Sequence, residues 1–134
     1  MSANPFFIKN ARTETVLSTA TCSRDGLTGT LYKLFSADTS NGSRIESISC
    51  MNVATQSGSN NANLVWVYTT NINGTSASLF REGQISLVTN STLNGGPGYN
   101  FNFPGGLFLG TNSSIYVGQA VYNGIADRFH WVAY

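Results

Sequence analysis

The chain has 134 residues, enough for one domain with a continuous core, and it is poor in charge. Charged residues make up 10% of it, against about 25% in a typical globular domain, and the net charge is +1. Because amides and hydroxyls carry the polarity instead, we expect other subunits to cover much of the surface. The alternative is an isolated soluble β-protein that uses Asn, Ser and Thr for solvation and turns.

The basic residues are scattered along the chain, so we expect no binding to nucleic acid. No apolar run approaches the roughly 18 residues that cross a bilayer. Residues 1–12 (MSANPFFIKNAR) lack the basic leader and the long apolar centre of a signal peptide. We therefore expect a protein without membrane contact that is made and assembled in a cytoplasm.

Two cysteines, Cys22 and Cys50, are present. In a reducing compartment two isolated cysteines are more often buried free thiols than a disulfide, and we predict free thiols. A disulfide between them is the alternative. Their spacing offers no zinc site.

Short strands separated by turn residues account for the first third of the chain. Residues 1–14 are interpreted as an N-terminal arm or a first edge strand. Alternating side chains then predict strands at residues 14–22 and 29–37. Turns are predicted at residues 23–26 (SRDG) and 38–43 (DTSNGS).

Two longer strands are predicted next. Residues 44–54 open with an apolar spacing of three, which a β-bulge near Ser47 explains better than a helix, because polar residues and Asn-Gly and Ser-Gly turns surround it. Residues 64–70 (LVWVYTT) are β-branched and aromatic, which predicts a central strand.

Glycine-containing breaks are predicted to divide the segments that follow into shorter strands. Residues 77–81 and 84–89 are predicted as two strands separated by residues 82–83 (EG). Residues 99–103 alternate aromatic with Asn, and residues 104–106 (PGG) interrupt the pattern before a further apolar run.

The last block, residues 103–134, is the most apolar part of the chain and alternates with a period of two. One of its faces is expected to fill the core, and the other is expected to meet a neighbouring subunit. The candidates for the core face are Ile115, Val117, Phe129 and Trp131. The candidates for the other face are Tyr116, Tyr122, His130 and Tyr134.

About eight short strands, turn signals roughly every ten residues and no convincing helix predict an all-β fold. We interpret residues 15–134 as a single antiparallel β-sandwich domain that is jelly-roll-like. A closed barrel is the main alternative.

No catalytic motif stands out. His130 is the one histidine, and Asp127 would point to the opposite face of a strand, so it could orient the imidazole only if the chain bends. No Gly-x-Ser-x-Gly segment marks a nucleophile, and no glycine-rich segment is followed by Lys-Ser/Thr. We predict a protein that is not an enzyme, with no catalytic, cofactor-binding or metal-binding residues.

The aromatic residues could fill the core, anchor a subunit interface or stack on sugar rings. They include Tyr99, Phe101, Phe103, Tyr116, Tyr122, Trp131 and Tyr134. We expect most of them to be in the core. The candidate protein interface consists of Phe6, Phe7, Ile8, Tyr116, Tyr122, His130 and Tyr134.

Three short segments and the aromatic chain end carry a resemblance to a known group of proteins. They are residues 42–48 (GSRIESI), 64–68 (LVWVY) and 103–109 (FPGGLFL). Their order resembles small virion proteins of tailed bacteriophages, of the head decoration or cement type. The Phe-Pro-Gly-Gly segment departs from the simpler Pro-Ala-Gly pattern of that group, which leaves a tail or fibre position open.

Members of that group are jelly-roll-like, and the resemblance implies a homotrimer on a capsid lattice, where it clamps neighbouring capsomers. The partners would be further copies of the chain and the major capsid protein or other virion subunits. The sequence thus predicts a capsid decoration protein located in the virion. The alternative is a tail or fibre component or a carbohydrate-binding receptor-recognition module.

Overall fold

The computed structural model describes residues 13–52, 62–70, 77–86, 98–120 and 129–134, and every regular element in these ranges is a β-strand. Within them no helix has the length and apolarity that a bilayer span requires. The strands are β1 (Glu14–Ser18), β2 (Tyr32–Ser36), β3 (Ser43–Asn52), β4 (Ala62–Thr70), β5 (Ala77–Ser86), β6 (Gly98–Leu109), β7 (Ser114–Gln119) and β8 (Phe129–Ala133).

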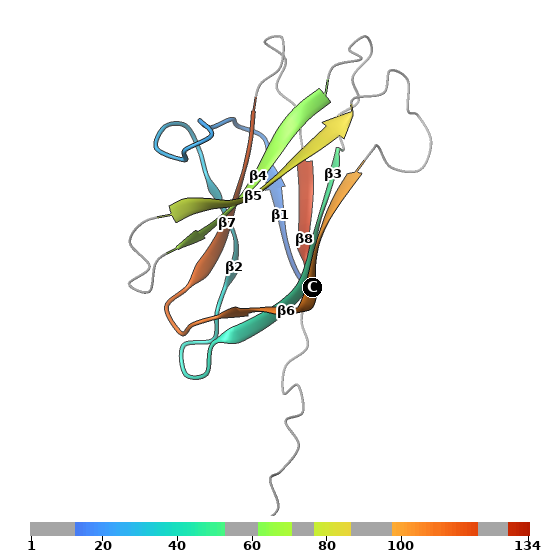
Figure 1. Cartoon of the computed structure of the whole chain (residues 1–134). Coiled ribbons are helices and arrows are strands. Elements are labelled where there is room, and N and C mark those ends of the chain that lie inside the picture. The colour runs from blue at the N-terminus through green and yellow to red at the C-terminus, as the bar shows by residue number, and fades with distance from the viewer. Residues whose placement is uncertain (1–12, 53–61, 71–76, 87–97, 121–128) are drawn as a thin grey trace, which may run out of the picture.

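The strands form two four-stranded sheets, in the orders β1-β8-β3-β6 and β2-β7-β4-β5. Every pairing is antiparallel, and the sheets pack face to face (Figure 1). This order, in which the chain crosses repeatedly from one sheet to the other, is that of a jelly roll. The prediction of an all-β, jelly-roll-like sandwich is confirmed, and the strands do not form one closed barrel.

Alternating side chains from both sheets fill the space between them. On β8, Phe129, Trp131 and Ala133 are buried, whereas His130 and Val132 are half-buried. The predicted core face of the last block is therefore confirmed. The central residues of this core include Ile45, Ile48, Val65, Val67, Ile85, Ile115, Val117, Phe129 and Trp131.

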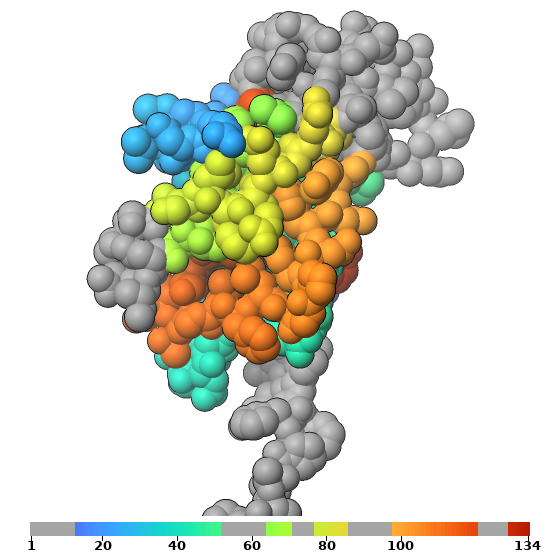
Figure 2. Space-filling view, viewed as in Figure 1, coloured from blue at the N-terminus to red at the C-terminus, as the bar shows by residue number. Residues whose placement is uncertain are grey.

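One long side of the sandwich is closed by contacts between β5 and β6, which lie side by side in yellow and orange (Figure 2). The rings of Phe80 and Phe103 stack with centroids 6.0 Å apart. The Tyr99 ring lies over Gly83, where an added Cβ would be 2.8 Å from its Cδ1. The prediction of two strands separated at Gly83 is wrong, because β5 is continuous and Gly83 serves close packing within it.

β6 is also continuous, so the predicted interruption at residues 104–106 is wrong. Gly105 and Gly106 have φ of 81° and 90°, and they lie where the pairing of β6 with β3 shifts register. On β3 the shift falls between Ile45 and Ser47, which confirms the predicted bulge. Both strands bend at this point, at the lower end of the sandwich (Figure 1).

The first two strands are shorter than predicted, because β1 ends at Ser18 and β2 begins at Tyr32. Between them, residues 19–31 form a separate loop, called the strap below. Its turn at residues 23–26 is as predicted, with the Gly26 amide donating to the Ser23 carbonyl at 3.0 Å.

A buried hydroxyl joins the two sheets. The Trp131 indole nitrogen donates to Ser18 Oγ at 2.9 Å, and Ser18 Oγ donates to Gln119 Oε1 at 2.5 Å. All three side chains are fully buried. Gln119, which breaks the apolar series of β7, therefore lies on the inward face with a hydrogen-bond partner.

We expect Ser18→Ala to lower the free energy of unfolding by about 1–3 kcal/mol, because it removes the buried hydroxyl that bonds to both Trp131 and Gln119. Urea unfolding followed by circular dichroism measures this loss. Ser49→Ala is the matched control, since Ser49 Oγ also donates one hydrogen bond, to Asn100 Oδ1 at 2.8 Å, but at an exposed position. Equal losses in the two variants would contradict a special role for the buried hydroxyl.

Candidate interaction surface

The candidate interface residues of the last block lie on opposite sides of the molecule. Tyr116 lies on β7 between the buried Ile115 and Val117, and His130 lies on β8 between the buried Phe129 and Trp131. β7 and β8 belong to different sheets, so Tyr116 and His130 are on different outer faces. The structure thus divides the set that the sequence placed on one face.

Of the remaining candidate interface residues, the structure describes only Tyr134. Tyr134 is exposed at the end of β8, on the same side as His130. Phe6, Phe7, Ile8 and Tyr122 lie outside the described residues.

The strap covers the outer face of the sheet β2-β7-β4-β5. Trp66 and Tyr68 alternate with the inward-facing Val65 and Val67, so they point outward, yet they are only 4% and 0% exposed. The Tyr68 hydroxyl lies within hydrogen-bond distance of two strap carbonyls, those of Ser23 at 3.1 Å and Arg24 at 3.0 Å. A second, smaller packed layer therefore lies outside this sheet.

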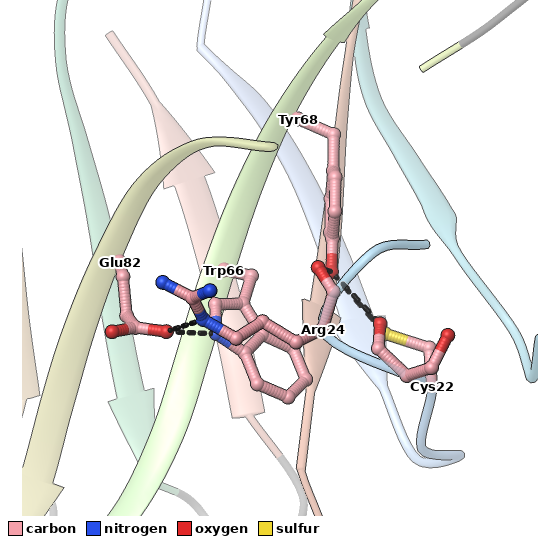
Figure 3. Close-up of polar contacts among 6 residues, drawn as sticks. Cys22, Arg24, Trp66, Tyr68 and Glu82 are labelled. Carbon is pink, nitrogen blue, oxygen red and sulfur yellow. Dashed lines mark hydrogen bonds and ion pairs between the residues drawn. The ribbon is translucent and has the colours of Figure 1, made fainter. Parts of the chain in front are cut away.

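An ion pair anchors the strap to β5 (Figure 3). Glu82 Oε2 accepts from Arg24 Nε at 2.7 Å and from the Trp66 indole nitrogen at 2.6 Å. These hydrogen bonds, that of Arg24 first, lower the pKa of the Glu82 carboxyl. Glu82 thus connects the strap to the β4 and β5 strands beneath it.

Cys22 packs the strap onto β7. Its amide donates to the Gln119 carbonyl at 3.0 Å, and its Sγ lies 3.7 Å from the Tyr68 hydroxyl (Figure 3). A Cβ on Gly118 would collide with this sulfur, so a side chain there is incompatible with the seated strap. Cys22 and Cys50 are free thiols, as predicted, and burial raises the pKa of both.

The outer face of the other sheet is not covered by the strap, and we call its upper part the open face. Across its strands, Leu17, His130 and Met51 are directly opposite one another. A second row crosses all four strands next to the first. Its members are Thr15, Val132, Ser49 and Asn100.

The open face carries no acidic or basic residue other than His130 among the positions that the structure describes on it. The described Asp, Glu, Lys and Arg of this sheet are Glu14, Arg44 and Glu46, all at its lower end. Leu17 is 46% exposed at its edge, and Met51 is 36% exposed. A surface without Asp, Glu, Lys or Arg is typical of the centre of protein interfaces, where charged residues are depleted.

Three of the aromatic residues considered for sugar stacking are inaccessible. Trp131 is fully buried, and Phe101 and Phe103 are buried beside it, so these three fill the core. Exposed aromatic surface is instead supplied by Tyr99, which is 37% exposed, by Tyr134, and by Phe108, which is 73% exposed. Phe108 was missed, although its place between Leu107 and Leu109, in a run that ends on a buried leucine, is a signal that it faces outward.

Groups suited to catalysis do not converge in the described ranges. No three His, Cys, Asp or Glu side chains there gather as metal ligands would. His130 faces Leu17 and Met51 on the adjacent strands, and Asp127 lies outside the described residues. An open groove of about 530 Å³ lies between the strap and the start of β5; its lining residues are Ser23, Arg24, Asp25, Ala77, Ser78 and Leu79.

No family model matches the chain, and neither curated proteins nor solved structures provide a match. Its function is therefore inferred from the fold and from the two unlike outer faces.

We expect Gly118→Ala to lower the free energy of unfolding by about 1–3 kcal/mol, the usual effect of overpacking, because the added Cβ collides with Cys22 Sγ. Urea unfolding measures the loss, and Cys22→Ala in the same chain should recover part of it. Gly110→Ala is the matched control, since the nearest atom to its Cβ is Ser113 Oγ at 3.7 Å. A loss in Gly110→Ala equal to that in Gly118→Ala would argue against a tightly seated strap.

The Glu82 carboxyl should make stability depend on pH. Its pKa in the folded protein is below the unfolded value of about 4.3, so its contribution is present above that pH and is lost as the pH falls through the folded pKa. We expect unfolding free energies measured from pH 7 to pH 3 to decline less in Glu82→Gln than in the wild type. Parallel declines would show that Arg24 and Trp66 do not favour the charged carboxylate.

Proposed function

We propose that the protein is a non-enzymatic structural protein of a tailed-bacteriophage virion, a homotrimeric capsid decoration or cement protein. The observation that carries the proposal is the open face, a surface across four strands of a jelly roll whose described positions hold no acidic or basic residue other than His130. Jelly rolls also occur in lectins and enzymes, so the fold alone does not select the function. The resemblance in the sequence and the low charge of the whole chain add their support.

The open face suits attachment to a protein lattice for a physical reason. Burying a charged group costs several kcal/mol unless it is paired. Burying the apolar side chains of Leu17, Val132 and Met51 instead lowers the free energy of the complex, because water leaves them. Ser49 and Asn100 already bond to each other at 2.8 Å. The face can therefore dock on a neutral surface of another virion subunit without leaving charges unpaired.

Binding of this kind would stabilise the shell by mass action. A protein that binds the assembled lattice but not its separated subunits shifts the equilibrium toward the lattice. A trimer presents three copies of the open face, so weak individual contacts add up to firm attachment. No chemical step is needed.

A second candidate, a carbohydrate-binding module, is favoured by one observation. Phe108 and Tyr134 are exposed, and Arg44 and Glu46 lie close to them with polar groups that can bond to sugar hydroxyls. Trp131 cannot take part, because it is fully buried. Binding on a glycan array that disappears in Tyr134→Ala, with the fold intact, would select this function.

We expect the purified protein to sediment at about three times the mass of the 14.3 kDa chain and to bind capsids that lack it.

Leu17→Lys should weaken capsid binding at least about tenfold, because it buries a charge in the docked open face. Leu27→Lys is the matched control, since Leu27 is 82% exposed on the strap, away from that face. A monomer that does not bind capsids, or full binding by Leu17→Lys, would refute the proposal.

A further inference from the structure

Below the open face, at the lower end of the same sheet, four residues form an exposed cluster that we call the Phe108 corner. It consists of Arg44, Glu46, Phe108 and Tyr134. The β3 and β6 strands bend here, and the chain end lies against the bend (Figure 1). The Glu46 amide donates to the Tyr134 carbonyl at 2.7 Å, and the Tyr134 amide donates to the Ser47 carbonyl at 2.9 Å, so backbone bonds hold Tyr134 beside β3.

The exposed Phe108 ring is held in place by Arg44. The two residues are directly opposite in the β3–β6 ladder, and the Arg44 guanidinium carbon lies 5.6 Å from the ring centroid. The Arg44 stem packs over Gly106, where any Cβ would displace it. Tyrosine and arginine are among the residues that dominate binding energy in protein interfaces, and side chains that already contact each other lose less conformational entropy on docking.

The two charges of the corner are paired but accessible. Arg44 Nη2 lies 3.0 Å from Glu46 Oε1, and the side chains are 48% and 56% exposed. An exposed ion pair of this kind contributes little to the stability of the chain itself. The same groups can therefore exchange partners with a neighbouring molecule at little loss.

We infer that the Phe108 corner is the contact between copies of this chain, in which Arg44 of one copy pairs with Glu46 of the next. The corner carries one positive and one negative side chain. A partner of one charge sign would satisfy one of them and repel the other, but a second copy related by a rotation axis satisfies both. The Phe108 and Tyr134 rings supply apolar area around these pairs, and the corner is continuous with the neutral open face.

This inference rests on the proposed self-association and names the surface that produces it. Charge reversal tests it directly on the full chain, with native mass measured by sedimentation. Arg44→Glu alone places two acidic groups in each corner, and Glu46→Arg alone places two basic groups there. Each should weaken association at least tenfold, and the double variant Arg44→Glu/Glu46→Arg should regain the native mass.

Arg81→Glu is the matched control. Arg81 is also an exposed arginine over an aromatic ring, with its guanidinium carbon 4.0 Å from the Phe80 centroid, but it lies on the other sheet. It should keep the native mass, and circular dichroism should show an intact fold in every variant. A wild-type monomer, single reversals that keep the native mass, or a double variant that remains dissociated would each overturn the inference.

Capsid binding separates this inference from the proposed function. One outcome is that the double reversal restores self-association while the wild-type protein fails to bind capsids. In that case the corner is the subunit contact and the cement function is wrong. If capsid binding is intact while the single reversals leave the mass unchanged, the function stands and the corner does not hold the copies together.

Discussion

The hydroxyl of Ser18 is the point on which both sheets depend. It accepts from Trp131 on the neighbouring strand and donates to Gln119 on the opposite sheet, in a core that is otherwise apolar. Buried hydrogen bonds are directional, so these two bonds favour one relative position of β1, β8 and β7. Their bonds therefore align the two sheets more specifically than apolar packing would.

With the inner faces aligned, the two outer faces differ sharply in character. The strap covers one of them, burying Trp66 and Tyr68 and attaching through Glu82 and Arg24. Among the described residues no such layer covers the other face, which carries neutral side chains on all four strands. The strap thus makes the two outer faces chemically unlike, and this difference is the basis on which we propose the open face, rather than the covered one, as the docking side.

Local patterns in the sequence predicted which residues point inward, but not which sheet each strand joins. Alternation correctly placed Ile115 and Trp131 in the core, and the irregular spacing near Ser47 correctly indicated a bulge. Gly83 was misinterpreted as a break between two strands. A side chain is excluded there by the Tyr99 ring, which comes from a strand distant in the sequence. Contacts between distant segments have no signature in local periodicity.

The same limit explains the candidate surface. Tyr116 and His130 look equivalent in the sequence, because each alternates with buried neighbours, and only the sheet order places them on opposite sides. Phe108 and Tyr134, far apart in the chain, are brought to one corner by the bend of β3 and β6.

In the proposed function the bend would matter because a neutral face and a charged corner supply different properties. Neutral surface provides binding energy when water leaves it but tolerates many orientations, since few of its contacts are directional. Charged pairs add little net free energy but penalise every wrong alignment, because a misplaced Arg44 or Glu46 would meet its own sign. Placing the charged pair at the end of the neutral face, on backbone held by Tyr134, allows one surface to combine attachment with a defined orientation.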